Sequence, residues 1–582
     1  MTSRSSLSTG APTQTKPKAV CGGEERRHAS LLLRERNRCD CVAERESQQT
    51  LVLSPEQAYK TAEQYRVVKR SIDARQRQLK VNLTLLLDQN GHPLPKDAPI
   101  PLYDAPVFQD VHNAPRHVHI IGAGPAGLFA ALTLIEHGIK PIIYERGKEV
   151  SERKRDIAQL NRNVCLNAES NYCFGEGGAG TFSDGKLFSR SKKRGNMQRV
   201  MELFHYFGAS DTVLYETHAH IGSDKLPSII RAMRECIITH GDEIHFETCV
   251  TSLKNFKFQN SNSKFARLSR STETINHKFE IINAPVILAI GHSAHDTYRM
   301  LAQEGVALQT KGFAMGVRVE HPQSLINSLM YHLTAERSHI SQRSGLTGEA
   351  DLIHYIGNAS YSLVTQVDGR GVYSFCMCPG GHMVPATSST DACVVNGMSA
   401  SHRNSPYANS GIVVQINPED IPLICQRSGL TGAADPLAGL RLQEYVEHLA
   451  FVHGGAPAIA PAQRLADFVR GKRSADLPAC SYLPGTRSSA LHEWMPPFIA
   501  ERLRQGFRDF DRKYPGFLTN DALILATESR SSSAVRIPRD PDTLQSLSHP
   551  NLYPCGEGAG YAGGITSSAL DGINAALRIA AQ

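Results

Sequence analysis

The segment HVHIIGAGPAG, residues 117–127, decides the fold. Its first five residues form a β-prone run, the glycine pattern G-x-G-x-x-G follows, and residues 128–137 have the composition of a helix. In a dinucleotide-binding unit the first glycine permits the tight turn, the second lets the backbone approach a pyrophosphate, and the third allows the helix to pack closely on the strand. Free N–H groups at the helix start bind the phosphates. The predicted cofactor residues in this loop are Gly122, Ala123, Gly124, Pro125, Ala126 and Gly127.

An acidic residue follows at a distance that suits a ribose. Residues 141–144 form the next β-prone run, which ends at Glu145, eighteen residues beyond Gly127. A carboxylate at this place accepts hydrogen bonds from the adenosine ribose and disfavours a 2′-phosphate, so the pattern favours FAD or NAD over NADP. We also expect Arg146 and Arg153 to contact the cofactor, and for Arg153 the alternative is an ordinary charge on a helix surface.

A second glycine-rich loop begins 434 residues after the first. The β-prone run 551–554 leads into the sequence CGEGAG of residues 555–560, and a helix is expected over 569–581. A second helix start can hold the far end of a long ligand, and an acid in the loop can bind ribityl hydroxyls, so we predict FAD as the cofactor. The alternative is a glycine loop shaped only by packing. The predicted residues are Gly556, Glu557, Gly558, Gly564, Ile565 and Thr566, together with Gly291 at the end of an intervening buried-type strand.

Length and composition exclude several classes of protein. The 582 residues include 41% hydrophobic and 20% charged residues, which excludes a collagen-like, fully disordered or coiled-coil chain. Lys and Arg exceed Asp and Glu by 7, a mild excess that permits anionic ligands without specifying nucleic acid. No apolar run approaches the roughly 18 residues that a membrane span needs, so we expect none.

The cysteines point to a reducing compartment. Thirteen cysteines without regular spacing predict free thiols, and we therefore expect a cytoplasmic protein. Organellar targeting by the Ser- and Arg-rich residues 1–48 is the alternative, against which six acidic residues among the first fifty argue. The two C-x-C pairs, at 39–41 and 376–378, have no matching second pair, so no metal site is predicted.

The order of these signals predicts an α/β fold in five segments. Residues 54–56, with Ser as the cap and Pro at the first helical position, start a helix in a small ferredoxin-like module. The two glycine loops imply one Rossmann-like, three-layer FAD-binding domain that is split by an inserted β-rich cap. The expected segments are a flexible extension (1–48), the small α/β module (49–113), the first part of the FAD-binding domain (114–300), the cap or substrate domain (301–520) and the C-terminal part of the FAD-binding domain (521–582).

Several longer motifs resemble those of one family. They read KRSIDAR at 69–75, FGEGGAGTFSDGKL at 174–187, HIGSD at 220–224, FCMCPGG at 375–381, NGMS at 396–399 and GEGAGYAGG at 556–564. From about residue 50 onward the chain resembles the FAD-dependent dehydrogenase-like proteins of the glutathione-reductase-type flavoprotein superfamily. The resemblance implies bound FAD without a defined substrate, and it places the backbone of Val250 against the adenine. Residues 529–534, SRSSSA, depart from the family's T-R-T-S-S-P, and the lost proline removes a constraint on that loop.

The loop 174–187 contains five glycines and is a candidate to wrap the pyrophosphate or cover the flavin, with Asp184 among its polar members. An ordinary surface loop is the alternative, because such loops are often rich in glycine. The predicted cofactor residues are Gly178, Gly180, Thr181, Ser183, Gly185 and Lys186.

Five further residues are candidates for catalysis or substrate binding. A C-x-C disulfide is strained and C-x-x-C is the usual redox spacing, so Cys376 and Cys378 are either a redox pair or structural thiols. His382 is either a proton donor or a structural histidine. Arg530 and Arg536 carry guanidinium groups that suit a substrate carboxylate or a flavin carbonyl.

These features predict an FAD-dependent oxidoreductase. We expect a dehydrogenase that passes a hydride between a small-molecule substrate and bound flavin, with a separate electron acceptor. The alternatives are a non-catalytic FAD-bound scaffold or redox sensor, and a flavin-dependent RNA-modifying enzyme. Because basic residues are scattered and no RNA-binding signature is present, we do not expect a nucleic-acid partner. The oligomeric state stays open.

Overall fold

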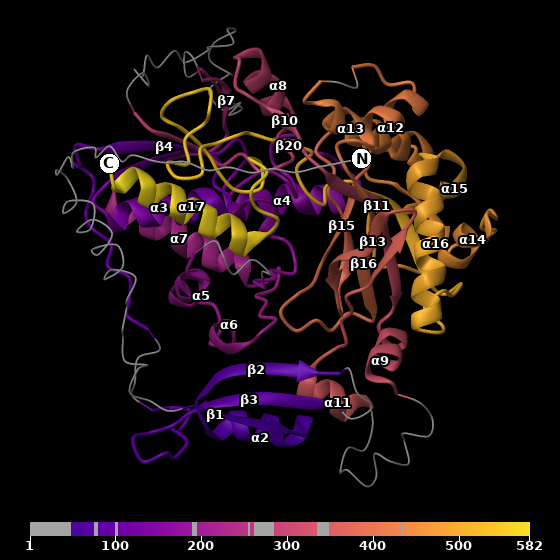
Figure 1. Ribbon diagram of the computed structural model, residues 1–582, viewed down its shortest axis with the longest axis horizontal. Coiled ribbons are helices and arrows are strands. Elements are labelled where there is room, and N and C mark those ends of the chain that lie inside the picture. The colour runs from indigo at the N-terminus through magenta and orange to yellow at the C-terminus, as the bar shows by residue number, and fades with distance from the viewer. Residues whose placement is uncertain are drawn as a thin grey trace, which may run out of the picture.

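The computed structural model describes residues 48–74, 79–98, 103–188, 195–241, 243–253, 257–260, 284–333, 349–432 and 435–582. The expectations for residues 1–47, a flexible extension or a targeting segment, lie outside this part of the chain. The described residues form a cofactor domain, a cap and a small N-terminal module, which Figure 1 shows at the left, right and bottom.

The cofactor domain is built on five strands in the order β21-β9-β4-β5-β6. All neighbouring strands run parallel. The loops that follow β4 and β21 therefore emerge at the same carboxyl edge of the sheet, where ligands of open α/β sheets bind. The predicted α/β class is confirmed. The strands are β4 (His117–Ile121), β5 (Lys140–Tyr144), β6 (Glu243–His245), β9 (Val286–Leu288) and β21 (Leu552–Pro554).

Helices cover one face of this sheet and a hairpin lies on the other. Ile120 and Ile287 pack with the helices, whereas their neighbours Ile121 and Leu288 pack with Val250 of the hairpin, as the two-residue alternation of a strand requires. The arrangement is the expected three layers. The helices of the first face are α3 (Pro125–Glu136), α5 (Met197–Tyr206), α6 (Thr212–Tyr215), α7 (Leu226–His240) and α17 (Ile565–Ala580). Helix α8 (His295–Gln303) packs on the other face beside the hairpin of β7 (Thr248–Ser252) and β8 (Lys257–Asn260), and α4 (Val150–Asn161) packs toward the cap.

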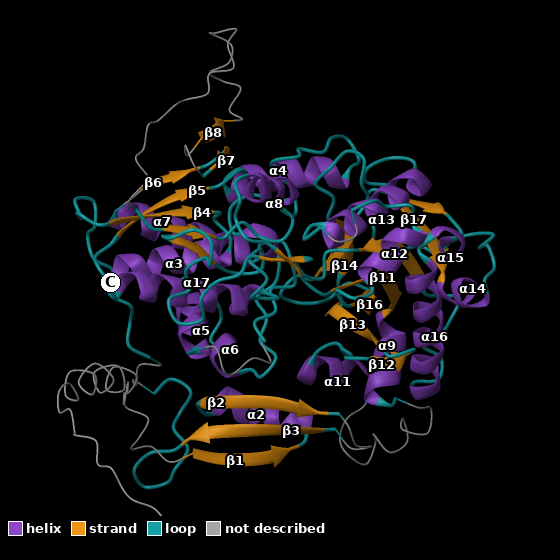
Figure 2. Ribbon diagram, turned by 45° about the horizontal axis from the view of Figure 1, so that its top comes forward, coloured by secondary structure: helices purple, strands orange, loops and turns teal. Residues whose placement is uncertain are grey.

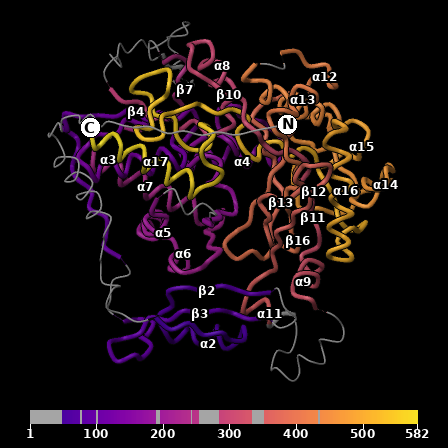
Figure 3. Tube along the Cα trace, in the orientation of Figure 1, coloured from indigo at the N-terminus to yellow at the C-terminus, as the bar shows by residue number. Residues whose placement is uncertain are grey.

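Helices α3 and α17 pack backbone against backbone, although one begins at residue 125 and the other at residue 565 (Figure 3). A Cβ atom on Gly572 of α17 would lie 2.0 Å from the carbonyl oxygen of Ala126 in α3, so any side chain at this position forces the two helices to shift. The neighbouring Ala575 and Ala576 are fully buried. Small side chains thus bring the C-terminal helix against the helix of the first glycine loop.

The cap is a seven-stranded sheet in the order β12-β13-β16-β11-β19-β17-β18, antiparallel except where β17 meets β18. Its central strands β11 and β16 are almost entirely buried because helices and loops cover both faces. The strands are β11 (Phe313–Pro322), β12 (Val364–Val367), β13 (Arg370–Cys378), β16 (Tyr407–Ile416), β17 (Ala460–Arg464), β18 (Thr486–Ser488) and β19 (Leu523–Glu528).

One expected boundary is wrong. Strand β19, assigned from the sequence to the C-terminal part of the FAD-binding domain (521–582), pairs with β11 and β17 in the cap sheet. The cap therefore extends beyond residue 520, since an apolar strand follows the last cap helix directly. The remaining cap and linking elements are β10 (Gln309–Thr310), α9 (Gln323–Tyr331), α11 (Glu349–Ile356), β14 (His382–Pro385), β15 (Val395–Met398), α12 (Ile421–Arg427), α13 (Ala438–Gly454), α14 (Leu465–Arg470), α15 (Leu491–Trp494), α16 (Pro497–Lys513) and β20 (Val535–Arg536).

The N-terminal module combines strands and a helix. In its described residues the sheet has the order β1-β3-β2, and helix α2 begins at Pro55 with a capping box between Ser54 and Gln57. A ferredoxin-like unit is a βαββαβ arrangement, and the described residues of the module form the first half of it. Figure 2 shows the three strands in front of α2. The elements are β1 (Gln48–Leu53), α2 (Pro55–Gln64), β2 (Val67–Asp73) and β3 (Lys80–Leu86).

The described residues contain neither a membrane-spanning helix nor a metal-binding cluster. None of the helices there is long and apolar enough to cross a membrane. Nor do those residues bring together three or more His, Cys, Asp or Glu side chains in a way that would hold a metal ion.

The contact between α3 and α17 makes a stability prediction. Replacing Gly572 with Ala places a methyl group against the Ala126 carbonyl, and overpacking of this kind costs about 1–3 kcal/mol. We expect the melting temperature of Gly572→Ala to fall by several degrees. Leu577→Ala, on the exposed side of the same helix, is the matched control and should change little. Equal melting temperatures for the two variants would contradict this packing.

Candidate functional site

A cavity of about 730 Å³ opens at the carboxyl edge of the parallel sheet, between the two glycine loops and the cap. A volume in this range suits a cofactor or substrate. Most of the predicted cofactor residues line it: Gly122, Gly124, Pro125, Ala126, Glu145, Arg146, Gly178, Gly180, Ser183, Gly185, Lys186, Val250, Gly291, Gly556, Glu557, Gly564, Ile565 and Thr566. The predicted residues Ala123, Gly127, Arg153, Thr181 and Gly558 are not part of this wall.

The first glycine loop has the geometry that a phosphate site needs. Gly122 has φ +105°, and a Cβ there would lie 2.4 Å from the carbonyl oxygen of Ala289. A Cβ on Gly127 would lie 2.0 Å from the carbonyl oxygen of Gly122, so Gly127 serves helix-to-strand packing. Gly124 is the N-cap residue of α3, and it has no side chain that could accept hydrogen bonds from the first N–H groups of the helix. The start of α3 therefore faces the cavity as an anion site.

Glu145 holds three backbone segments together on the cavity wall. One carboxylate oxygen accepts hydrogen bonds from the N–H groups of Gly147 and Gly175, at 2.9 Å each, and the other accepts from Ala123 N–H at 2.9 Å. A carboxylate has about four lone-pair sites, so these three bonds leave one for a ribose hydroxyl. Glu145 is 5% exposed and lines the cavity.

Arg153 has a different place from the one we expected. Its side chain is completely buried and donates to the carbonyl oxygens of Asn171, Tyr172, Gly175, Glu176 and Gly178. It neither lines the cavity nor lies on the helix surface. A Cβ on Gly175 would lie 2.4 Å from the Arg153 Cδ. Arg153 therefore shapes the loop 171–178 from behind, an arrangement of non-local carbonyls that no local sequence pattern indicates.

The other arginine beside Glu145 does reach the cavity. Arg146 forms ion pairs with Glu169 at 2.8 Å and with Asp296 at 2.9 Å. Its guanidinium carbon lies 4.2 Å from the centre of the Phe174 ring. Because two carboxylates surround it, Arg146 braces the wall more than it supplies free positive charge.

The end of the cavity that faces the cap carries an ion cluster built around a buried carboxylate. Asp184 is 1% exposed and accepts from Lys186 Nζ at 2.8 Å and from the Arg403 guanidinium at 2.6 Å. Burial opposes ionisation, but the Lys186 and Arg403 charges outweigh it and lower the pKa of Asp184. Arg403 was not predicted, because it lies 219 residues from Asp184.

A carboxylate of helix α17, that of Asp571, fixes the second glycine loop. Asp571 accepts from the N–H of Gly556 at 2.7 Å and pairs with the Arg539 guanidinium at 2.6 Å. A Cβ on Gly558 would lie 2.4 Å from the carbonyl oxygen of Gly291, so Gly558 is needed for packing, which was the alternative for this loop. Helix α17 then begins at Ile565, behind the cavity-lining Gly564. Both α3 and α17 thus start at the cavity.

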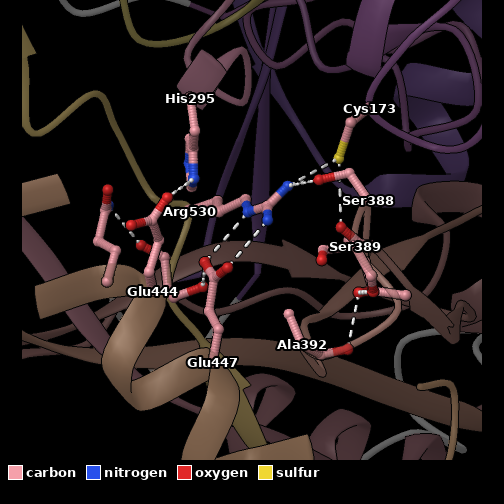
Figure 4. A network of polar contacts seen from close by, with 12 residues as sticks. Cys173, His295, Ser388, Ser389, Ala392, Glu444, Glu447 and Arg530 are labelled. Carbon is pink, nitrogen blue, oxygen red and sulfur yellow. Dashed lines mark hydrogen bonds and ion pairs between the residues drawn. The ribbon is translucent and has the colours of Figure 1, made fainter. Parts of the chain in front are cut away.

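Arg530 lies in a polar network on the cavity wall (Figure 4). Its guanidinium binds both oxygens of Glu447, at 3.1 and 2.9 Å, and the remaining nitrogen donates to Ser388 Oγ at 2.8 Å and Cys173 Sγ at 3.3 Å. The charge of Arg530 is neutralised by Glu447, so its main role here is to tie helix α13 to the cavity wall.

Arg536 keeps its charge available. It is exposed, lines the cavity and stacks over the Tyr561 ring, with 5.5 Å from the guanidinium carbon to the ring centre. Among the described residues no carboxylate pairs with it. Burial, with the Arg536 charge, lowers the pKa of the nearby Lys311. Of the two predicted arginines, Arg536 is the better placed for an anionic group.

Of the three remaining candidates, one lines the cavity and two do not. Cys376 lines the cavity, and Cys378 is buried behind it. His382 is exposed at the start of β14 and does not reach the cavity wall, so its predicted role as a proton donor finds no support in its position.

Three segments of the chain match described protein families. Residues 116–166 match the FAD binding domain, and residues 312–531 match the C-terminal domain-like region of FAD-dependent proteins. Residues 49–88 match a domain of unknown function, DUF8436. The match of the first glycine loop and the cap to FAD families agrees with the fit of both loops to a long dinucleotide. FAD is the cofactor of this protein.

A bacterial relative covers most of the chain. An uncharacterized protein from Clostridium beijerinckii is 37% identical over 530 residues, which is 88% of this chain and 91% of the relative. Among solved structures, the chain is similar to CtdE in complex with FAD and substrate 4 (11% identity, 80% of each chain, TM-score 0.27). It is also similar to a geranylgeranyl bacteriochlorophyll reductase-like protein from Thermoplasma acidophilum (11% identity, 79% of this chain and 77% of that one, TM-score 0.31).

Glu145 gives a test of its predicted role in FAD binding. Glu145→Ala removes the acceptor of three backbone hydrogen bonds, and bonds to a charged group contribute about 1.5–3 kcal/mol each. We expect FAD affinity to fall at least about tenfold, measured by titrating flavin-free protein with FAD. Glu152→Ala, on the exposed surface of α4, is the control. An unchanged affinity for Glu145→Ala would show that the carboxylate does not shape the site.

The Arg530–Glu447 pair gives a second test. Arg530→Met leaves a buried carboxylate without its cation, which costs about 3–5 kcal/mol, and we expect a clear fall in melting temperature. The double variant Arg530→Met, Glu447→Gln should recover most of the lost melting temperature, because the buried charge is removed together with its partner. Arg530 outweighs burial and lowers the pKa of Glu447, so the stabilisation is present above the ordinary glutamate pKa of about 4.3 and is lost as the pH falls. No loss in the single variant would contradict the pairing.

Proposed function

This chain belongs to the family of the Clostridium beijerinckii protein, and we propose that it is an FAD-dependent oxidoreductase of the dehydrogenase type within the glutathione-reductase-type superfamily. One observation carries the proposal. A single cavity joins both glycine loops of the cofactor domain to polar side chains of the cap, so a substrate held by the cap lies beside the flavin end of the cofactor. When bound, FAD supplies the capacity to accept or donate a hydride.

The protein's own residues bind and orient the substrate. Arg536 is exposed on the cavity wall and unpaired among the described residues, so it binds an anionic substrate group such as a carboxylate. Lys186 is held in place by Asp184 and presents a second cation to the same cavity. Asn396 adds an amide that can donate or accept a hydrogen bond. The substrate is therefore a small anionic molecule, and a separate acceptor collects the electrons.

The cap limits access of water to the reacting groups. Phe375 and Cys376 of β13 contribute to the wall opposite the glycine loops. Strand β13 is held in the cap sheet by β16, and Arg318, which is completely buried, donates to the carbonyl oxygen of Cys376 at 2.9 Å. This fixed wall orients a bound substrate without large movements of the backbone. Cytoplasmic location is part of the same proposal.

The function is tested by anaerobic mixing of the purified flavoprotein with NADH, NADPH and a panel of small carboxylic acids. We expect at least one compound to bleach the flavin absorption. For an anionic reductant, Arg536→Leu should raise the concentration needed about tenfold or more, because a charge-assisted hydrogen bond is lost. Reduction of that variant by dithionite, which controls for intact flavin, should be unchanged. If the flavin is bound but no compound reduces it, a non-catalytic scaffold replaces the enzyme. A chain that binds no FAD would refute both.

A further inference from the structure

Two sulfur atoms lie where the cap wall departs from regular strand geometry. The pairing of β13 with β16 shifts register between Phe375 and Cys378, and Cys376 has φ +48°. A non-glycine residue rarely adopts this left-handed conformation, and such residues gather at functional sites when the surrounding structure holds them there. The bulge breaks the regular spacing of side chains along the strand. The strain expected of a C-x-C disulfide in a straight strand therefore does not apply in the same way here.

The two cysteines divide into an accessible and a buried thiol. Cys376 lines the cavity, whereas Cys378 is fully buried and its thiol donates to the carbonyl oxygen of Cys376 at 3.3 Å. A small molecule in the cavity therefore meets Cys376 first, and Cys378 lies directly behind it. This is the order in which an attacking and a resolving thiol are used in disulfide exchange.

Two cations contact the pair. Lys186 Nζ lies 3.8 Å and Arg318 Nη2 lies 3.7 Å from Cys378 Sγ. Arg318 is paired with Glu528 at 2.8 Å, and Lys186 shares the single carboxylate of Asp184 with Arg403. Two cations on one carboxylate leave one positive charge beside the sulfurs. A single thiolate neutralises it.

The titration of the pair agrees with this charge count. Hydrogen bonding between the two thiols, together with the Lys186 and Arg318 charges and against burial, makes the first proton leave at a lower pKa than that of an ordinary thiol. The second proton is held at a raised pKa, because the first negative charge and burial oppose its loss. Burial raises the pKa of Glu528, the partner of Arg318, to about 7, so this acid titrates in the same pH range. The other titratable groups that face the cluster are His220, Glu320, Tyr331 and Tyr361.

We propose that Cys376 and Cys378 form a thiol–disulfide exchange centre that takes low-molecular-weight disulfides from the cavity. The Cys376 thiolate attacks one sulfur of the substrate, its S–S bond breaks, and one thiolate leaves while a mixed disulfide forms on Cys376. Cys378 then gives its proton to the departing thiolate and attacks the Cys376 sulfur, which releases the second half of the substrate. The protein loses two electrons and one proton, and the substrate disulfide gains both to become one thiol and one thiolate.

The exchange uses no flavin. It therefore goes beyond the function proposed above, and either activity can fail without the other. The pair is also distinct from the other thiols that line the cavity, Cys173, Cys249 and Cys555, none of which has a second cysteine two residues away.

The test is oxidation of the folded, purified protein by hydroxyethyl disulfide, with acid quenching, alkylation of the remaining thiols and peptide mapping. We expect a disulfide between Cys376 and Cys378, formed at pH 7 at least tenfold faster than any modification of the exposed Cys165. The rate should reach half of its maximum at a pH below about 8.5, the ordinary thiol value. Cys165→Ser is the control and should leave the rate unchanged.

Variants separate the two roles. Cys378→Ser should trap the mixed disulfide on Cys376, and Cys376→Ser should abolish the fast phase. Lys186→Met removes one stabilising cation, so the rate at pH 7 should fall at least fivefold and the pH profile should move upward. The proposal is overturned if the wild-type pair stays reduced while Cys165 reacts, or if its pH profile is that of Cys165. These wild-type results stand even if a variant does not fold.

Discussion

The contact of Gly572 with the backbone of Ala126 is the constraint on which the site depends. Because no side chain separates the two helices, the start of α17 lies beside the start of α3, and both helix ends open into one cavity. Two segments 434 residues apart thus supply the backbone N–H groups and glycines for one long ligand. The cap is inserted between them and returns its final strand, β19, to its own sheet before the chain re-enters the cofactor domain.

Buried carboxylates fix the loops that a ligand meets. Glu145 gathers three N–H groups around the first loop, and Asp571 holds the N–H of Gly556 while it pairs with Arg539. Asp184 holds Lys186 at the cap end. Each acid is paired or hydrogen-bonded, as burial of a charge requires. The geometry of the site is therefore set by electrostatics within the protein before any cofactor arrives.

The sequence predicted the parts of the site that are local. The glycines of residues 122–127 predict a tight turn and a helix packed closely on the preceding strand, and these two features indicate the fold. The predicted boundary between the cap and the C-terminal part of the FAD-binding domain, near residue 520, was wrong because β19 is an apolar strand that either sheet could accept. Arg153 was misplaced, since its five carbonyl partners are set by the tertiary course of the loop 171–178. Arg403 and Asp184 meet only because cap and cofactor domain are packed together, which no local pattern shows.

The claim that both ends of the chain build one FAD site is tested most directly by hydrogen–deuterium exchange with and without FAD. We expect FAD to slow exchange of the backbone N–H groups in peptides that cover residues 122–128 and, to a comparable degree, in peptides that cover 556–568. Protection of the first loop alone, with unchanged exchange at 556–568, would contradict the account.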